Sequence, residues 1–545
     1  MGSPPLDAPG TAEPLRPRRV LVAAAAVLAL TCLPLLTGWW RTPPGQEFRW
    51  ARGLNSSDFL ASQAMILRAA AGEHPVRSSY CSTPERSGGL WRPTYELLGV
   101  AVGALGVSPV LAFHLGRLAA GLLFLQALYR LAALVWPTER QRWQAWTLCA
   151  LGSGLSWLAW ALHPAHPPSA WADSIQAEAT AFSMLQEGPH MVVGHWLLIE
   201  VALGLLLALR ASEPAAVRRG ALRASLAAAL ALLDQPYLGP PLVLLVGLGL
   251  ILARGPAVPP VSAAAVAALV GLGALLSAQD VLWRLAIEPR YAAWNEGTGS
   301  FPPGVFLLGN APLWLLALLG AAEWRGPPWA RRLLVAWALG YWALVYLPLP
   351  NQRRFCEGWT LPLALLAAAG LDALRARWPR RATVPLALGL ACAGSLHLQV
   401  MQVRAQASGE LYRPQALGEA LRSLRARLSP GDLVLADWDT SEELAAVAGC
   451  RVVHGHLHQG RAEPPLLQAA AAELRRAAGE GRAPRFGGEL AGVTWVAAVR
   501  RSDGALRVVL DDARGEVLWE GPAAWGPPLL AGEALALLPL PGPPS

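Results

Sequence analysis

The sequence predicts an all-α polytopic membrane protein with about eleven transmembrane helices, followed by a small C-terminal extracytoplasmic α/β domain. Three observations favour this fold class. Hydrophobic residues make up 54% of the 545 residues and charged residues only 15%, whereas a soluble globular protein has about 25% charged residues. Apolar runs of about 20 residues, the length that crosses a bilayer, recur along most of the chain. Beyond residue 401 these runs give way to shorter helix-like and strand-like patterns.

The first apolar run covers residues 20–40 and follows three arginines, Arg16, Arg18 and Arg19. No small-residue cleavage site follows this run, so we expect an uncleaved anchor and a cytoplasmic N-terminal tail at 1–19. Further spans are expected at residues 109–136, 143–162, 190–209, 221–234, 236–252, 260–287, 303–322, 329–350, 359–374 and 383–401. Together they form a membrane domain at 20–401 with a large first outer loop at 41–107.

The arginines between the spans test the orientation independently of hydropathy, because cytoplasmic loops carry an excess of positive charge. With a cytoplasmic N-terminus, every strongly basic turn falls on the cytoplasmic side: residues 140–142, 210–223, 254, 325–332 and 375–381. The outer segment 163–189 has no arginine. This orientation places the domain at 402–545 outside the cytoplasm. It also explains the net charge of +8 without a nucleic-acid partner.

The first outer loop carries the first candidate functional residue. Ser56 or Ser57 can cap a helix that runs to about residue 71, with the apolar spacing of a helix lying in the membrane interface. Asp58 falls in the first turn of this helix. There a carboxylate either complements the helix dipole or serves as a general base beside a membrane-embedded substrate.

Gln352, Arg353 and Arg354 form the second candidate, because two arginines on the outer side contradict the positive-inside pattern. Their guanidinium groups either snorkel to lipid headgroups or hold the phosphate of a polyprenyl-phosphate sugar. A third group lies at or beside outer span ends: Glu187, His190, Asp234 and Tyr237. These side chains are either hydrated and idle, or they line an outward-facing cavity that binds an acceptor.

In the tail, the patterns predict helices at 414–428 and 441–448 and strands at 432–436, 451–454, 494–499 and 506–510. His454, His456 and His458 alternate along the chain, as at the end of a strand or in a zinc site. The six cysteines show no CxxC spacing, which argues against a metal site or redox motif built from them. A disulfide among the outer cysteines stays open; these are Cys81, Cys356 and Cys450.

The chain resembles the multi-spanning type-C (GT-C) glycosyltransferases. The likeness is to the branch of lipid A aminoarabinose transferases and protein O-mannosyltransferases, and to related bacterial membrane proteins. The residues that carry the resemblance are Asp58-Phe59, Gly72-Glu73-His74, Trp91-Arg92-Pro93 with Tyr95, Glu187 to His190, Asp234 to Tyr237, and Leu349 to Phe355 followed by Gly358. Phe59 stands where that branch often has a second acid, although one aspartate suffices for a base.

This resemblance implies transfer of a sugar from a polyprenyl-phosphate donor to a lipid, glycan or protein acceptor, with inversion, at the outer face of a bacterial plasma (inner) membrane. Asp58 would be the catalytic base, and Gln352, Arg353 and Arg354 would bind the donor phosphate. Trp91 and Tyr95 would join the acceptor residues. No cofactor is expected from the residues, and a divalent metal stays open. The alternatives are a transporter or flippase for a lipid-linked glycan and a non-catalytic cell-envelope scaffold.

Overall fold

A computed structural model describes most of the chain. The described residues are 17–51, 56–80, 92–162, 177–211, 213–253, 299–348, 352–405, 411–455, 464–487, 490–491, 493–500, 506–511, 517–522, 529–530 and 535–540. The chain divides into two compact units. Unit 1 comprises Met1–Leu33 and Gly116–Met401, and unit 2 comprises Pro34–Leu115 and Gln402–Ser545. The first outer loop and the tail therefore share one unit, whereas the boundaries expected from the sequence kept them apart.

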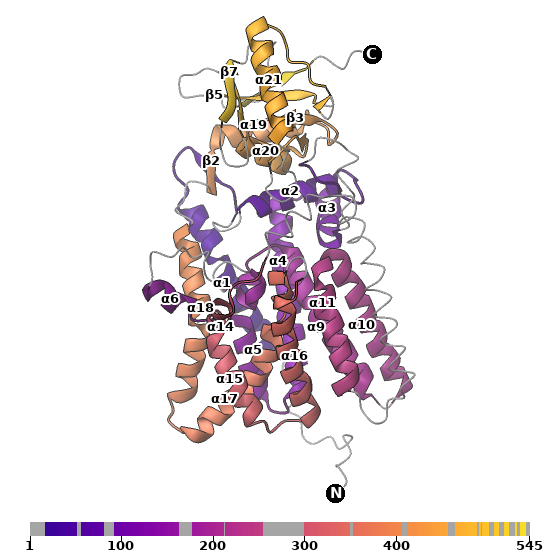
Figure 1. The fold of residues 1–545 in the computed structure, drawn as a ribbon, viewed down its shortest axis with the longest axis vertical. Coiled ribbons are helices and arrows are strands. Elements are labelled where there is room, and N and C mark those ends of the chain that lie inside the picture. The colour runs from indigo at the N-terminus through magenta and orange to yellow at the C-terminus, as the bar shows by residue number, and fades with distance from the viewer. Residues whose placement is uncertain are drawn as a thin grey trace. The chain divides into compact units, whose positions relative to one another are not determined.

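The membrane-spanning helices agree with a multi-pass membrane protein (Figure 1). Among the described residues, five helical stretches are long and apolar enough to cross a bilayer, or six if one bent pair counts as a span. The five are α1 (Pro17–Trp40), α4 (Pro109–Val135), α9 (Pro189–Arg210), the η6–α17 stretch (Gln352–Arg377) and α18 (Thr383–Ala405). The total of eleven stays a prediction, and the span expected at 260–287 lies outside the described residues.

The bent pair interrupts the continuous helix expected over residues 143–162. It consists of α5 (Glu139–Leu151) and α6 (Ser156–Leu162), which differ in direction by 45°. The break between the two helices, at residues 153–155, leaves backbone amides without partners in their own helix. Two of them find partners on other segments, because the Ser153 amide donates to the Ala391 carbonyl (2.8 Å) and the Leu155 amide to the Leu308 carbonyl (2.9 Å). A helix break at membrane depth needs this kind of compensation.

Small residues bring α9 and α10 (Pro214–Asp234) close together along their length (Figure 1). A Cβ atom on Gly204 would lie 2.6 Å from the Ala224 amide nitrogen, and one on Gly220 would lie 2.6 Å from the Ala208 amide nitrogen. Each glycine precedes the alanine of its own helix by four residues. This small-xxx-small spacing is typical of membrane helices whose backbones touch.

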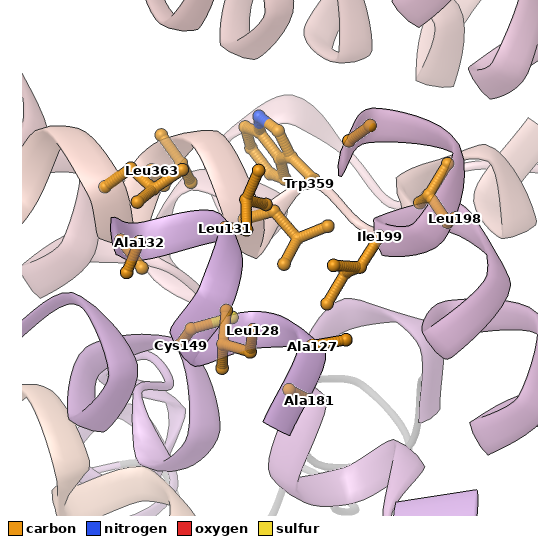
Figure 2. Close-up of a cluster of buried hydrophobic side chains, with 14 of the residues drawn as sticks. Ala127, Leu128, Leu131, Ala132, Cys149, Ala181, Leu198, Ile199, Trp359 and Leu363 are labelled. Atoms are coloured by element: carbon orange, nitrogen blue, oxygen red, sulfur yellow. The ribbon is translucent and has the colours of Figure 1, made fainter. Parts of the chain in front are cut away.

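A buried core joins α4, α5, α9 and the start of α17 (Thr360–Arg377), as Figure 2 shows. Leu128 and Leu131 of α4 meet Leu198 and Ile199 of α9, and all four side chains are at most 1% exposed. Trp359, immediately before α17, is fully buried among them, and its indole nitrogen donates to the Ala338 carbonyl of α16 (Pro328–Tyr346) at 3.0 Å. The core therefore fixes the beginning of α17. The other described helical elements of unit 1 are η3 (Ala177–Ala179), α8 (Ala181–Met184), η4 (Pro236–Leu238), α11 (Gly239–Leu248), η5 (Gly249–Ala253), α14 (Pro303–Leu308) and α15 (Ala311–Ala322).

Unit 2 contains a seven-stranded sheet in which β4-β3-β5-β6-β7 are neighbours and β8 and β9 pair beside β5. The strands are β3 (Leu433–Leu435), β4 (Arg451–Val452), β5 (Trp495–Arg500), β6 (Leu506–Asp511), β7 (Val517–Pro522), β8 (Leu529–Leu530) and β9 (Leu535–Pro539). Strand β3 runs parallel to β4 and β5, and the remaining pairings are antiparallel. The associated helical elements are α19 (Gln415–Arg425), α20 (Trp438–Glu443) with η8 (Leu444–Ala448), and α21 (Pro464–Glu480). Helix α21 and strands β7 to β9 were not expected.

The first outer loop contributes β1 (Gln46–Phe48), α2 (Ser56–Ala70) and α3 (Pro93–Leu105) to unit 2. Strand β1 pairs antiparallel with β2 (Tyr412–Pro414). The helix predicted after Ser56 is present, and its position in the membrane interface stays a prediction. Every residue of α2 from Phe59 to Ala69 is buried by protein, including Gln63 and Arg68. Helix α3 packs so closely on α2 that a Cβ atom on Gly99 would lie 2.3 Å from the Ala69 Cβ atom.

Candidate functional site

The two arginines predicted to bind phosphate lie in a short helical turn, η6 (Gln352–Cys356), that directly precedes Gly358 and α17. We call η6 the di-arginine turn. The Gln352 side-chain nitrogen donates to the Leu347 carbonyl at 2.6 Å, and its oxygen accepts from the Ser300 amide at 3.3 Å. Gly358 has φ +86°, and a Cβ atom there would lie 2.2 Å from a Leu198 methyl carbon. The backbone of the turn is therefore held at both ends.

Arg354 lies among aromatic and acidic side chains of unit 1. Its guanidinium group stands 5.0 Å from the centroid of the Tyr237 ring, a cation–π contact. One of its nitrogens lies 3.5 Å from a carboxylate oxygen of Glu178, whose side chain is only 5% exposed. Burial raises the pKa of the Glu178 carboxyl above its ordinary value, and the charge of Arg354 opposes that rise. The structure thus brings together Tyr237 and Arg354, two predicted site residues from separate segments.

A buried contact between a histidine and a carboxylate lies next to the di-arginine turn. Glu357 follows the turn, and its carboxylate lies 2.8 Å from Nδ1 of His195 on α9. The two side chains are 0% and 1% exposed. Neither Glu357 nor Glu178 was among the predicted functional residues. The sequence offered one indication: both glutamates lie in segments expected on the outer side, as Arg353 and Arg354 do.

The residues predicted to bind an acceptor gather in part where α9 begins and α10 ends. The side-chain amide of Gln235 donates to the His190 carbonyl and so ties the two helices together. A Cβ atom on Gly194 would lie 2.5 Å from the Gln235 side-chain oxygen, so only glycine leaves room for this contact. Asp234 is buried at the end of α10, and Glu187 is half-buried just before α9.

Arg353 differs from its neighbour. Within the part of the chain that the structure describes, no hydrogen bond or ion pair of Arg353 is present, and its Nε atom is buried without a partner. Its side chain is half-buried. Arg353 is therefore the member of the di-arginine turn whose charge is least engaged by the described protein groups.

Asp58 belongs to unit 2, where it is exposed in the first turn of α2. The Ser62 hydroxyl donates to the Asp58 carbonyl at 2.8 Å and lies 2.8 Å from the Tyr95 hydroxyl. Tyr95, a predicted acceptor residue, is thus linked to the Asp58 turn, whereas Trp91 lies outside the described residues. Burial raises the pKa of the nearby Tyr80 well above its ordinary value, and negative charges including that of Asp58 raise it further.

The described residues do not supply a metal centre. None of their histidine, cysteine, aspartate and glutamate side chains form a group of three or more that could hold a metal ion. Nε2 of His454 lies 2.8 Å from the Ala436 carbonyl, while His456 and His458 lie outside the described residues. Cys356 and Cys450 are free thiols, and Cys81 is likewise outside the described residues.

Comparison with known proteins identifies the fold. No protein-family model matches the chain, and no curated protein sequence matches it. Among solved structures, the chain is similar to the oligosaccharyltransferase AglB from Archaeoglobus fulgidus in complex with an inhibitory peptide and a dolichol-phosphate. The TM-score is 0.53 at 13% identity, covering 93% of this chain and 75% of AglB.

Two further solved structures show the same likeness. The arabinofuranosyltransferase AftD from Mycobacteria gives a TM-score of 0.51 at 18% identity, covering 91% of this chain and 36% of AftD. ArnT from Cupriavidus metallidurans, bound to undecaprenyl phosphate, gives 0.50 at 13% identity, covering 79% of this chain and 86% of ArnT. The GT-C fold expected from the sequence resemblance is confirmed.

Proposed function

We propose that this protein is a membrane glycosyltransferase that moves a sugar from a polyprenyl-phosphate donor to a lipid, glycan or protein acceptor on the outer face of a bacterial plasma membrane. The observation that carries the proposal is the di-arginine turn, where Arg354 lies beside the buried Glu178 and the Tyr237 ring, and the adjacent Arg353 forms no ion pair with a described residue. The fold supports it, because AglB was solved with a dolichol-phosphate and ArnT with undecaprenyl phosphate.

In this proposal Arg353, Arg354 and Gln352 bind the donor phosphate. Planar guanidinium groups match phosphate oxygens and offset the charge that develops on a leaving phosphate. The alternative, snorkelling to lipid headgroups, requires a charged group that extends into water. The Arg354 side chain is only 21% exposed and contacts Tyr237 and Glu178 instead. Its burial therefore favours a role inside the protein.

Asp58 is proposed as the general base. Its carboxylate takes the proton of the acceptor hydroxyl, whose oxygen attacks the anomeric carbon of the sugar. The bond between that carbon and the phosphate oxygen breaks, and polyprenyl phosphate leaves with the electron pair. Exposure of Asp58 allows an acceptor to reach it, and the helix N-terminus favours the ionised form that accepts a proton.

The acceptor role is proposed for two sets of residues: Glu187, His190, Asp234 and Tyr237 in unit 1, and Trp91 and Tyr95 in unit 2. The N-terminus is proposed to be cytoplasmic and residues 402–545 extracytoplasmic.

The test uses the purified full chain in lipid nanodiscs, supplied with polyprenyl-phosphate sugars and candidate acceptors. Asp58→Asn is expected to lower sugar transfer by about 10²–10⁴-fold, the usual contribution of a general base, while donor binding is retained. Arg353→Gln is expected to weaken donor binding. Glu419→Gln, which changes another exposed acid of unit 2, serves as the matched control and should transfer sugar at the wild-type rate.

Normal transfer by Asp58→Asn and Arg353→Gln would contradict the proposal. Movement of the donor lipid between leaflets without any sugar transfer would instead favour a transporter.

A further inference from the structure

The burial of the His195–Glu357 pair is not explained by a gain in stability. Both side chains are almost completely buried in unit 1, 2.8 Å apart. Removing charged groups from water is strongly unfavourable, and well-packed apolar side chains of similar volume often stabilise a protein as much or more. Nδ1 of His195 lies between Oε1 of Glu357 (2.8 Å) and the Met191 carbonyl (3.2 Å), whereas Nε2 of His195 and Oε2 of Glu357 have no hydrogen-bond partner among the described residues. A reason other than stability is therefore needed for the pair.

Such a pair is favourable only when its two side chains meet, because a polar group left without a partner in an apolar interior is penalised. One half is on α9, and the other directly follows the di-arginine turn. The Glu357 amide also donates to the Arg354 carbonyl at 3.1 Å, so the acid is part of the hydrogen-bonded turn. Docking of the turn onto α9 thus has one strongly preferred position.

The other contacts of the turn are apolar or lie away from α9, and the packing of Gly358 on Leu198 is the one that also reaches α9. Gln352 holds the start of the turn through Leu347, and Gly358 closes its end against Leu198. Arg354 is engaged by Tyr237 and Glu178. Among the described groups nothing comparable engages Arg353, whose position is set by the backbone of the turn.

We propose that His195 and Glu357 are positioning residues that hold the di-arginine turn on α9, so that Arg353 is placed to bind a lipid phosphate. The inference rests on the proposed function, because it names what orients the phosphate-binding arginine. Neither residue touches the substrate in this proposal. Their chemical contribution is to keep one charged group at a fixed place, as supporting contacts do in other binding sites.

The experiment measures binding of undecaprenyl phosphate and of uncharged undecaprenol to the full chain in nanodiscs. The key variant is the double replacement His195→Leu/Glu357→Leu, which removes both buried polar partners together and so avoids leaving one of them unpaired. We expect it to unfold at or above the wild-type temperature. It should bind the phosphate about tenfold more weakly and the alcohol unchanged.

Three comparisons sharpen this result. Glu357→Gln keeps an oxygen that accepts from His195 and should retain most of the phosphate affinity. The same double replacement of Glu200 and Arg223, which form an ion pair between α9 and α10, should leave phosphate affinity unchanged. Added to Arg353→Gln, the double replacement should cause no further loss, because the residue that it positions is already absent.

The possible results separate the two proposals. Wild-type phosphate affinity in the His195→Leu/Glu357→Leu variant, together with weakened binding by Arg353→Gln, would overturn the positioning role and leave the proposed function intact. Equal loss of phosphate and alcohol binding would also overturn it, because that pattern indicates general disruption. Both proposals would be overturned if the wild-type protein bound the phosphate no more tightly than the alcohol. They would also be overturned if Arg353→Gln bound the phosphate as tightly as the wild type.

Discussion

Replacing Gly358 by alanine tests how tightly the di-arginine turn is held. Gly358 has φ +86°, and an L-residue in the left-handed region costs about 1–2 kcal/mol. The new Cβ atom would also lie 2.2 Å from a Leu198 methyl carbon and 2.9 Å from the Tyr341 hydroxyl oxygen. Leu198 is fully buried in the core of Figure 2, so its movement displaces other core side chains, at a cost of about 1–3 kcal/mol. The expected destabilisation of unit 1 is therefore about 2–5 kcal/mol.

Thermal unfolding in nanodiscs measures this loss, and binding of undecaprenyl phosphate measures its effect on the turn. We expect Gly358→Ala to unfold several degrees below the wild type and to bind the phosphate more weakly. Gly389→Ala is the matched control, because Gly389 lies in α18 with no atom within 4 Å of the added carbon. That change is expected to be neutral or to stabilise by up to about 1 kcal/mol, through helix propensity. A Gly358→Ala protein as stable as the wild type would refute the steric reasoning.

Two further predictions concern unit 2. Arg413→Ala leaves Glu443, whose side chain is only 2% exposed, with one ionic partner fewer, and should destabilise the unit by about 3 kcal/mol in thermal unfolding. Arg476→Ala removes a pair whose arginine is exposed and should cost less than about 0.5 kcal/mol. Equal losses of stability in the two variants would contradict the reasoning from burial. Burial raises the pKa of Asp511 to about 6, so the folded state binds its proton more tightly and stability falls as the pH rises from about 4 to about 6. The Trp438 amide donates to Asp511, so Asp511→Asn should slow hydrogen exchange near Trp438 at pH 7 but not at pH 4. The same effect at both pH values would count against the raised pKa of Asp511 as its cause.

The sequence was informative wherever one segment carried its own signal. Arg353 and Arg354 stood out because they contradict the charge pattern of the loops, and the structure does engage Arg354 inside the protein. Asp58 could be placed in a helical first turn from capping residues alone. The burial of α2 could not be foreseen, because its apolar spacing is the same whether lipid or protein covers it.

The rest depended on contacts between distant segments. His195 and Glu357 lie in apolar surroundings about 160 residues apart, so no spacing rule relates them. Glu178 has the same difficulty, since its partner Arg354 follows much later in the chain. Strand β8 has only two residues, and for β7 to β9 the pairing with the sheet decides the conformation more than their own residues do.

The interruption between α5 and α6 has a consequence for the order of biosynthesis. The amides of Ser153 and Leu155 donate to carbonyls at Ala391 and Leu308, which the ribosome reaches only later. At about 5–20 residues per second, the chain needs roughly 10–50 s to progress from Ser153 to Ala391. During that interval these amides lack their final partners, and exposing them without a hydrogen bond to the lipid hydrocarbon would cost free energy. The α5–α6 segment therefore reaches its final state only once α18 has emerged, and until then it depends on water or on the insertion machinery.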